Sequence, residues 1–116
     1  MTSRSPITTH VLDTRTGLPA MGIAIELELF LHDDWKSLGR GVTDSNGRIS
    51  NLLPSDFALS SGKYRMHFDT GTYFELQAIS HFYPKVTIEF EVHAQSEHFH
   101  IPLLLSPFGY STYRGS

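Results

Sequence analysis

The strongest constraint on this fold is an alternation of apolar and polar side chains with a period of two residues. It is clearest in three segments, 23–31, 64–68 and 86–92. Successive side chains of a strand point to opposite faces of a sheet, so each segment is predicted to be an antiparallel strand with one buried and one wet face. Four further strands are expected, at 7–14, 35–43, 99–105 and 110–115.

Turn sequences separate the predicted strands, among them those at 45–47 and 106–109. Glycine, proline and asparagine favour such tight connections. Many short strands at this spacing are typical of a β-sandwich. The segment 70–80 departs from the alternation, because its apolar residues recur at helical spacing after Asp69 or Thr70, either of which is a suitable N-cap. This segment predicts one short helix.

The composition excludes several classes of protein. A chain of 116 residues, 40% of them apolar, is expected to form a single domain, 1–116, with a poorly ordered start at 1–6. A net charge of -3 without blocks of one sign argues against nucleic-acid and membrane partners. The absence of cysteine excludes disulfides, a thiol nucleophile and a thiolate metal site. Without a long apolar run or a signal-peptide pattern, we expect a cytoplasmic protein.

The carboxyl-terminal segment is rich in ordering signals for a chain end, where order is normally lost. Residues 99–116, FHIPLLLSPFGYSTYRGS, combine apolar and aromatic side chains with a Ser-Pro-Phe-Gly turn. We therefore expect the end of the chain to be packed. Its last four residues are then a candidate part of a site: Tyr113, Arg114, Gly115 and Ser116.

Three histidines and one arginine are candidates for chemistry because of the positions they occupy. His98 and His100 share the strand face opposite the apolar Phe99, so they are expected to point away from the core. His10 lies on the outer face of the first strand, and Arg48 follows a turn. Taken singly, such histidines are usually just solvated and such an arginine usually covers its neighbours. The other four histidines are given that interpretation: His32, His67, His81 and His93.

Two kinds of site would use these residues. In the first, His98, His100 and His10 hold a metal ion, although no carboxylate lies in the same short segment. In the second, a histidine acts as general base on water while arginines hold an anionic, planar substrate. Without a cysteine or a Gly-x-Ser-x-Gly turn, direct attack by water is favoured over a covalent intermediate. The pattern alone does not choose between these sites and a plain binding sandwich.

Three blocks of the sequence carry a family resemblance: TTHVLDTRTGLPA at 8–20, TDSNGRI at 43–49 and the segment 99–116. With them the chain resembles the transthyretin-like proteins and, among these, the 5-hydroxyisourate hydrolases. The first and third blocks are specific, and the likeness covers nearly the whole chain. Transthyretin itself, a hormone carrier, shares the Leu-Leu-Ser-Pro core of the third block and lacks its Tyr-Arg-Gly-Ser ending. His98 is not part of this motif.

The resemblance implies a fold, an activity and an assembly. The fold is an all-β, transthyretin-like (prealbumin-like) sandwich of two four-stranded sheets with one short helix. The activity is the hydrolysis of 5-hydroxyisourate to 2-oxo-4-hydroxy-4-carboxy-5-ureidoimidazoline in urate degradation, a part of purine metabolism, without a metal or another cofactor. The assembly is a homotetramer, a dimer of dimers, with the sites at the dimer–dimer interface.

The same resemblance implies roles for individual residues. His10, Arg48 and His100 are the catalytic residues, which polarise a water and accept its proton, and which histidine is the base stays open. The substrate-binding residues are Tyr113, Arg114, Gly115 and Ser116. The alternative function is that of a non-catalytic tetramer that binds small molecules as transthyretin does. A third hypothesis is an adhesion-type sandwich. Loss of His10, Arg48 or the Tyr-Arg-Gly-Ser ending would favour the binding protein, but all three are present.

Overall fold

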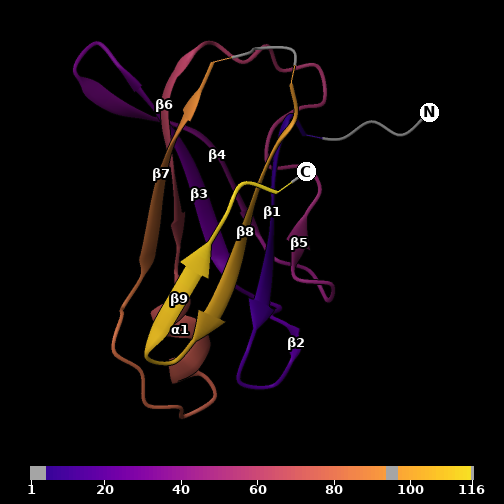
Figure 1. Ribbon diagram of the computed structural model, residues 1–116, viewed down its shortest axis with the longest axis vertical. Helices are drawn as coiled ribbons and strands as arrows, with labels where there is room; N and C mark the ends of the chain where they lie inside the picture. Colours follow the sequence, from indigo (N-terminus) through magenta and orange to yellow (C-terminus); the bar gives the residue numbers. More distant parts are fainter. Residues whose placement is uncertain (1–4, 94–96, 116) are drawn as a thin grey trace.

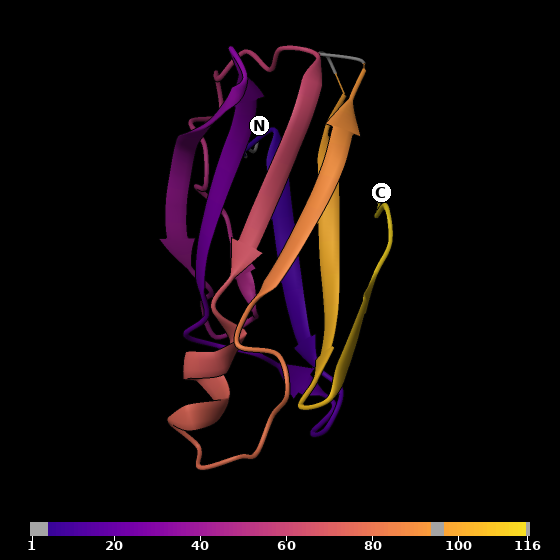
Figure 2. The same cartoon turned by 90° about the vertical axis from the view of Figure 1, so that its left-hand side faces the viewer.

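Two stacked sheets with a helix at one end form the molecule, as Figures 1 and 2 show. The computed structural model describes residues 5–93 and 97–115. Within them the elements are β1 (Ile7–Asp13), β2 (Leu18–Pro19), β3 (Ala24–Leu31), β4 (Asp34–Val42), β5 (Arg48–Ile49), β6 (Gly62–Phe68), α1 (Thr70–Glu75), β7 (Val86–Val92), β8 (Phe99–Ser106) and β9 (Gly109–Thr112). The expected all-β sandwich is confirmed.

One sheet is built around a parallel pair, β1 and β8. Its strands lie in the order β2-β1-β8-β9, and β5 also pairs with β1. The parallel register runs from Ile7 beside Phe99 to Asp13 beside Leu105, whereas the other pairs recorded in this sheet are antiparallel. The sheet has five strands where four were expected. The family resemblance implied four strands here, and the alternation predicted three of them, β1, β8 and β9; it missed β2 and β5, which have two residues each and are too short to produce an alternating pattern.

The second sheet has the expected four strands, in the order β4-β3-β6-β7, and is antiparallel throughout. The alternation predicted its buried face correctly. In β6 the side chains of Tyr64, Met66 and Phe68 are fully buried, and those between them are not. The core therefore lies between the two sheets, and the outer face of each sheet is left for polar side chains.

The helix α1 is shorter than the predicted segment 70–80. It begins after the N-cap Asp69, whose carboxylate accepts a hydrogen bond from the Thr72 N–H at 3.3 Å. It ends at Glu75, and Ala78 then takes a positive φ of 54°, which is incompatible with continuing a right-handed helix. No helix among the described residues could span a bilayer.

A partly buried hydrogen bond links α1 to the end of β1. The Tyr73 hydroxyl donates to Asp13 Oδ2 at 2.8 Å, and Asp13 is fully buried. The other carboxylate oxygen accepts from the backbone N–H of Arg15 at 2.9 Å. Burial, and after it the hydrogen bond to Asp13, raise the pKa of Tyr73 above its ordinary value. This contact fixes the helix against the sheet that carries the candidate site.

Both ends of the described chain are held by hydrogen bonds. Ser5, within the stretch expected to be poorly ordered, is buried and accepts a bond from the Leu53 N–H at 3.1 Å. At the other end β9 stops at Thr112, earlier than expected, but the Gly115 N–H still donates to the His100 carbonyl at 2.9 Å. The chain end is thus tied to β8 at Gly115, whereas residues 110–114 before it are exposed and not packed as expected. Residues 1–4 and Ser116 lie outside the described residues.

We predict that Tyr73→Phe lowers the free energy of unfolding by about 1–3 kcal/mol, because Asp13 then loses a hydrogen-bond donor in a buried position. Urea denaturation measures the change. Tyr83→Phe is the matched control. Tyr83 is 39% exposed, and the loss of its hydroxyl should change the free energy of unfolding by less than about 0.5 kcal/mol. Equal stability of the Tyr73→Phe variant and the parent would contradict the proposed role of this bond.

Candidate functional site

The outer face of the β1–β8 sheet gathers most of the candidate residues. In the ladders, Thr8 lies beside His100 and His10 lies beside Arg48, so β8, β1 and β5 place these side chains in adjacent rows. The residues flanking His100, Phe99 and Ile101, are each only 6% exposed and point into the core. The prediction that His98 and His100 point away from the core is therefore consistent with the structure. His10, Arg48 and His100 lie on the same face of the sheet, with His10 next to Arg48.

A shallow pocket of about 210 Å³ opens on this face. Its walls come from β1, β5 and the start of β8, and its lining is mostly polar: Thr8, Thr9, Arg48, Ile49, Ser50, His98 and His100. The pocket thus joins a fixed positive charge to two imidazoles and hydroxyl groups. This combination can hold an anionic or carbonyl-rich ligand and accept a proton from it or from water.

A tight turn positions Arg48. The Asp44 carboxylate accepts hydrogen bonds from the backbone N–H groups of Asn46 and Arg48, at 2.8 and 3.0 Å. Gly47 has a φ of +74°, and a Cβ at this position would lie 2.5 Å from the Val11 carbonyl oxygen. Only glycine therefore allows the turn to approach β1 this closely. The turn predicted at 45–47 is present and delivers Arg48 to the site face.

His10 is held toward its neutral form. Its pKa lies below the ordinary histidine value, first because the ring is partly buried and second because the Arg48 guanidinium is close. A hydrogen bond with the backbone of Asn46 and the charge of Asp44 act in the opposite direction without cancelling the effect. A neutral imidazole beside a cation is suited to accept a proton near neutral pH.

Thr8 was not among the predicted site residues, and His98 was a candidate only for the alternative metal site. Thr8 Oγ1 lies 2.8 Å from Nδ1 of His100 and 3.0 Å from Nε2 of His98, so it joins the two rings. The rings are nearly parallel, with their centroids 6.4 Å apart. His98 had been left outside the family motif, and its spacing from His100 was the available signal. Thr8 shares a strand face with His10, but its contact with His100 depends on a pairing across 92 residues.

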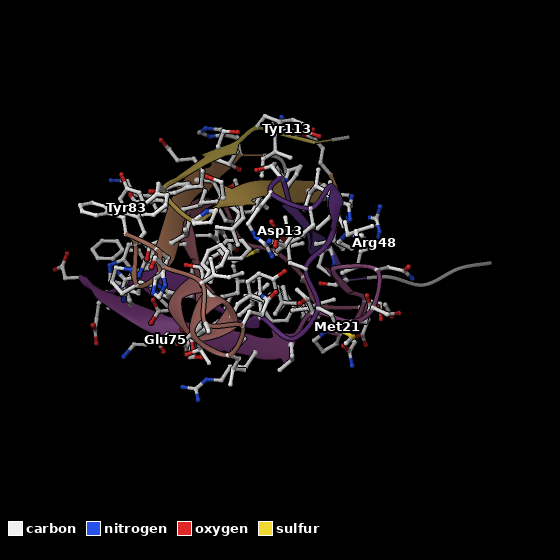
Figure 3. All side chains as sticks on the ribbon, turned by 90° about the horizontal axis from the view of Figure 1, so that it is seen from below. Asp13, Met21, Arg48, Glu75, Tyr83 and Tyr113 are labelled. Atoms are coloured by element: carbon white, nitrogen blue, oxygen red, sulfur yellow. The ribbon has the colours of Figure 1, made fainter. Side chains whose placement is uncertain are left out.

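The predicted substrate-binding residues do not all lie at the same place in the structure. Gly115 lies directly against His100, since a Cβ built on it would come within 2.6 Å of His100 Cδ2. Arg114 instead pairs with Glu97 at 3.0 Å and lies over the Phe99 ring, 4.9 Å from its centroid. Figure 3 shows Tyr113 on the rim of the molecule, well away from Arg48. Ser116 lies outside the described residues.

Arg114 and Tyr113 border a different groove, of about 250 Å³, which also contacts β7 and β8. His100 is the only predicted catalytic residue that lines both this groove and the pocket on the outer face. Within the described part of one chain, Arg114 and Arg48 therefore do not line the same pocket.

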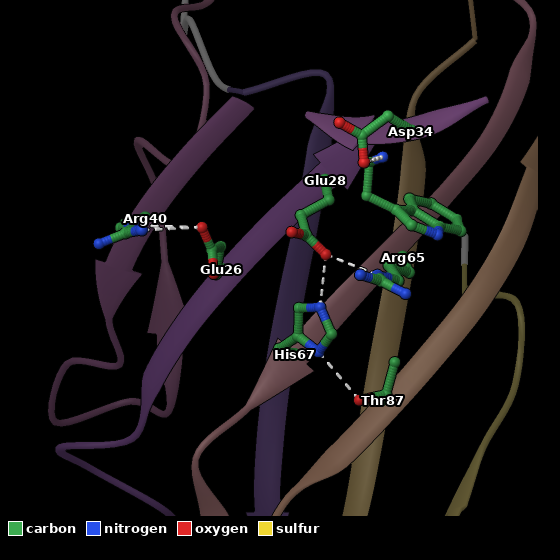
Figure 4. A network of polar contacts seen from close by, with 8 residues as sticks. Glu26, Glu28, Asp34, Arg40, Arg65, His67 and Thr87 are labelled. Carbon is green, nitrogen blue, oxygen red and sulfur yellow. Dashed lines mark hydrogen bonds and ion pairs between the residues drawn. The ribbon is translucent and has the colours of Figure 1, made fainter. Parts of the chain in front are cut away.

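The opposite sheet carries a second polar network, drawn in Figure 4. Glu28 accepts hydrogen bonds from Arg65 at 2.5 Å and from His67 at 2.6 Å, and the other ring nitrogen of His67 lies 2.9 Å from the Thr87 hydroxyl. Burial alone would raise the pKa of Glu28, but these hydrogen bonds outweigh it and hold the pKa below its ordinary value. Arg65 also stacks on Trp35 at 4.1 Å. Mutual pairing of this kind indicates a structural role.

The metal alternative finds no support in the ligand geometry. Among the residues that the structure describes, no group of three or more histidine, aspartate or glutamate side chains is placed to hold a metal ion. A larger groove, of about 690 Å³, lies on the outer face of the second sheet, where Arg40 is already paired with Glu26 at 3.0 Å. The pocket on the first sheet is smaller, but it contains Arg48 together with His98 and His100.

Fold and site together define a class of protein: a β-sandwich with a histidine–arginine pocket on the outer face of one sheet. The sequence model of the HIUase/Transthyretin family matches residues 7–115. The chain therefore belongs to this family.

Relatives and solved structures agree. A 5-hydroxyisourate hydrolase of Salmonella typhimurium is 46% identical over 110 residues, which cover 95% of this chain and 80% of that protein. The structure of Klebsiella pneumoniae 5-hydroxyisourate hydrolase superposes with a TM-score of 0.83 at 34% identity, covering 95% of this chain and 98% of that one. Transthyretin from Sparus aurata superposes with a TM-score of 0.88, also at 34% identity, and covers 97% of both chains.

We predict that Arg48→Gln raises the pKa of His10, because the loss of the guanidinium charge removes one of the two causes that lower it. An NMR titration of the His10 ring measures the change. The folded-state pKa of the parent is below that of the unfolded chain, so the parent loses stability at this site as the pH falls below the ordinary histidine value. The variant should lose less.

Arg40→Gln, on the other sheet, is the matched control and should leave the titration of His10 where it is. A pKa of His10 that stays the same or falls in Arg48→Gln would contradict this electrostatic account of the site.

Proposed function

We propose that this protein is a 5-hydroxyisourate hydrolase, which opens the substrate ring to give 2-oxo-4-hydroxy-4-carboxy-5-ureidoimidazoline in urate degradation. The observation that carries the proposal is the convergence of His10, Arg48 and His100 on one open face. It occurs in a chain that is 46% identical to a protein with this activity.

The reaction needs a water, a base and a site for negative charge. The water oxygen bonds to the ring carbonyl carbon while a histidine, His100 or His10, accepts its proton. The ring C–N bond then breaks, the departing nitrogen takes up a proton, and the carbonyl carbon becomes the free carboxylate. Neutral imidazoles are required for the first step, and the lowered pKa of His10 fits this requirement.

Arg48 is the stabilising cation in this scheme. Its guanidinium is charged at every working pH and matches the planar oxygens of the substrate, and it offsets the charge that develops at the tetrahedral centre. Tyr113, Arg114, Gly115 and Ser116 complete the substrate pocket. For Arg114 this requires that it exchange its partner Glu97 for a substrate oxygen, which its 63% exposed side chain leaves room to do.

We further propose that four copies assemble as a dimer of dimers, with the site faces of two dimers opposed. A pocket of about 210 Å³ on an open face is smaller than the roughly 300–1,000 Å³ of typical ligand sites, and a second copy placed against this face would enclose it. Sedimentation equilibrium should give the mass of four chains. A fully active monomer would contradict the proposal.

The activity is tested by generating 5-hydroxyisourate from urate with urate oxidase and following its decay in the ultraviolet. We predict that the protein accelerates the decay, with or without a chelator. His100→Asn and Arg48→Gln should each lower turnover by about 10²–10³-fold. The first variant removes a proton acceptor, and the second removes the positive charge that stabilises the tetrahedral centre.

His32→Asn is the matched control, since His32 lies in an exposed turn with a φ of 53°, which asparagine also accepts. This variant should have the parent's activity. Decay at the spontaneous rate with the folded parent protein would refute the hydrolase and favour a non-catalytic binding protein. Loss of activity with the chelator would restore the metal site.

We also predict that Gly115→Ala lowers turnover by about 10²-fold, because the new methyl group would force the His100 ring out of position. Gly109→Ala is the matched control, since its Cβ would meet only Ser106 Oγ at an ordinary 3.7 Å. Both variants are assayed in the same way after their folding is checked by circular dichroism. Parent activity in Gly115→Ala would show that the chain end does not constrain His100.

A further inference from the structure

The Thr8 hydroxyl lies between two imidazoles. Its oxygen is 2.8 Å from Nδ1 of His100 and 3.0 Å from Nε2 of His98, both within hydrogen-bond distance. A hydroxyl carries a single proton, so it can donate to one ring only and must accept from the other. The states of the two rings are therefore linked through Thr8.

We propose that Thr8 is a positioning residue, which couples the protonation of His98 to the tautomer of His100. The inference rests on the proposed hydrolase activity for its consequence, although the coupling itself is a property of the three side chains. Thr8 and His98 line the pocket, but in this proposal both affect the reaction through His100 and not by contact with the reacting atoms.

Two arrangements of protons satisfy the two contacts of Thr8 when both rings are neutral. In the first, His100 donates from Nδ1 to Thr8, and Thr8 donates to Nε2 of His98; Nε2 of His100 then carries a lone pair and can accept a proton. In the second, His98 donates from Nε2 to Thr8, and Thr8 donates to Nδ1 of His100; the proton of neutral His100 is then on Nε2. Only the first arrangement makes Nε2 of His100 a base.

Protonation of His98 selects the second arrangement. A charged imidazole carries a proton on both nitrogens, so Nε2 of His98 can only donate to Thr8. Thr8 must then donate to Nδ1 of His100, and Nε2 loses its lone pair. Acidification therefore switches off His100 through His98, while Thr8 keeps its place in the ladder between β1 and β8.

Other charged or titratable groups surround these rings and enter the design of the test. They are His10 on β1, Asp44 in the turn before β5, Arg48 on β5, Glu89 and Glu91 on β7, Glu97 before β8 and Arg114 after β9. Arg48 stays cationic, and Glu97 pairs with Arg114 at 3.0 Å. His10 is a third titratable imidazole on this face, so His10→Gln is needed as a separate control.

Three variants test the coupling, with kcat and KM for 5-hydroxyisourate measured across the pH range around neutrality. Thr8→Val removes the hydroxyl at nearly constant shape and should lower kcat about tenfold with little change in KM. Thr8→Ser keeps the hydroxyl and should restore the parent kcat. His98→Gln offers Thr8 an amide oxygen at every pH, so its kcat should persist to lower pH than that of the parent.

The decisive comparison is the double variant. If His98 acts through Thr8, adding His98→Gln to Thr8→Val should leave the acid side of the profile unchanged, whereas His10→Gln should shift it in both backgrounds. Equal effects of His98→Gln with and without Thr8 would overturn the proposal. So would a Thr8→Val variant with the parent's kcat and pH profile.

A readout without substrate separates this inference from the proposed activity. The ¹⁵N shifts of the His100 ring report which nitrogen carries the proton. They should move from the Nδ1–H to the Nε2–H form as His98 becomes charged, in the parent and in Thr8→Ser but not in Thr8→Val. If the tautomer of His100 stays the same when His98 becomes charged, the coupling is overturned, even if the enzyme is active. An inactive parent that shows the switch would instead refute only the hydrolase.

Discussion

The parallel pairing of β1 with β8 is the interaction on which the rest of the structure depends. Its seven residue pairs join segments from the two ends of the chain. On the inner side of the sheet, Val11 and Leu103 lie side by side and are fully buried. On the outer side, the same register places Thr8 beside His100. A shift by one residue would turn the apolar side chains outward and remove the site at once.

The two outer faces of the sandwich show how a site differs from a structural network. On the second sheet, the charge of Glu28 is balanced by Arg65 and His67, and its pKa falls accordingly. On the first sheet, His10 lies partly buried beside the positive Arg48, an arrangement that disfavours the charged imidazole. Groups held in mutually unfavourable surroundings are more typical of functional sites than of structural ones.

Much of the fold was accessible from the sequence because one face of each strand is buried. Alternation predicted the long strands of both sheets and the outward direction of His98 and His100. It missed β2 and β5, whose two residues leave no periodic signal. The helical spacing of apolar residues extended the predicted helix to residue 80, because this spacing continues past Glu75, where α1 ends.

The site was predicted less completely. Family resemblance supplied His10, Arg48 and His100, which the structure brings together. The contact of Thr8 with His100 depends on a parallel pairing between distant segments, and local pattern does not determine such a pairing. The direction of Arg114 depends on its partner Glu97 and on the Phe99 ring, and the strand expected at 110–115 ends at Thr112, before it reaches Arg114.

The central claim is that the outer face of β1, β5 and β8 binds the substrate, and a crystal structure with a planar, non-hydrolysable purine analogue tests it most directly. The account predicts that an analogue oxygen lies within about 2.7–3.2 Å of the Arg48 guanidinium, with the ring next to His100. An analogue bound instead in the groove formed by Ile88, Phe90, Thr112 and Arg114, with Arg48 and His10 untouched, would contradict it.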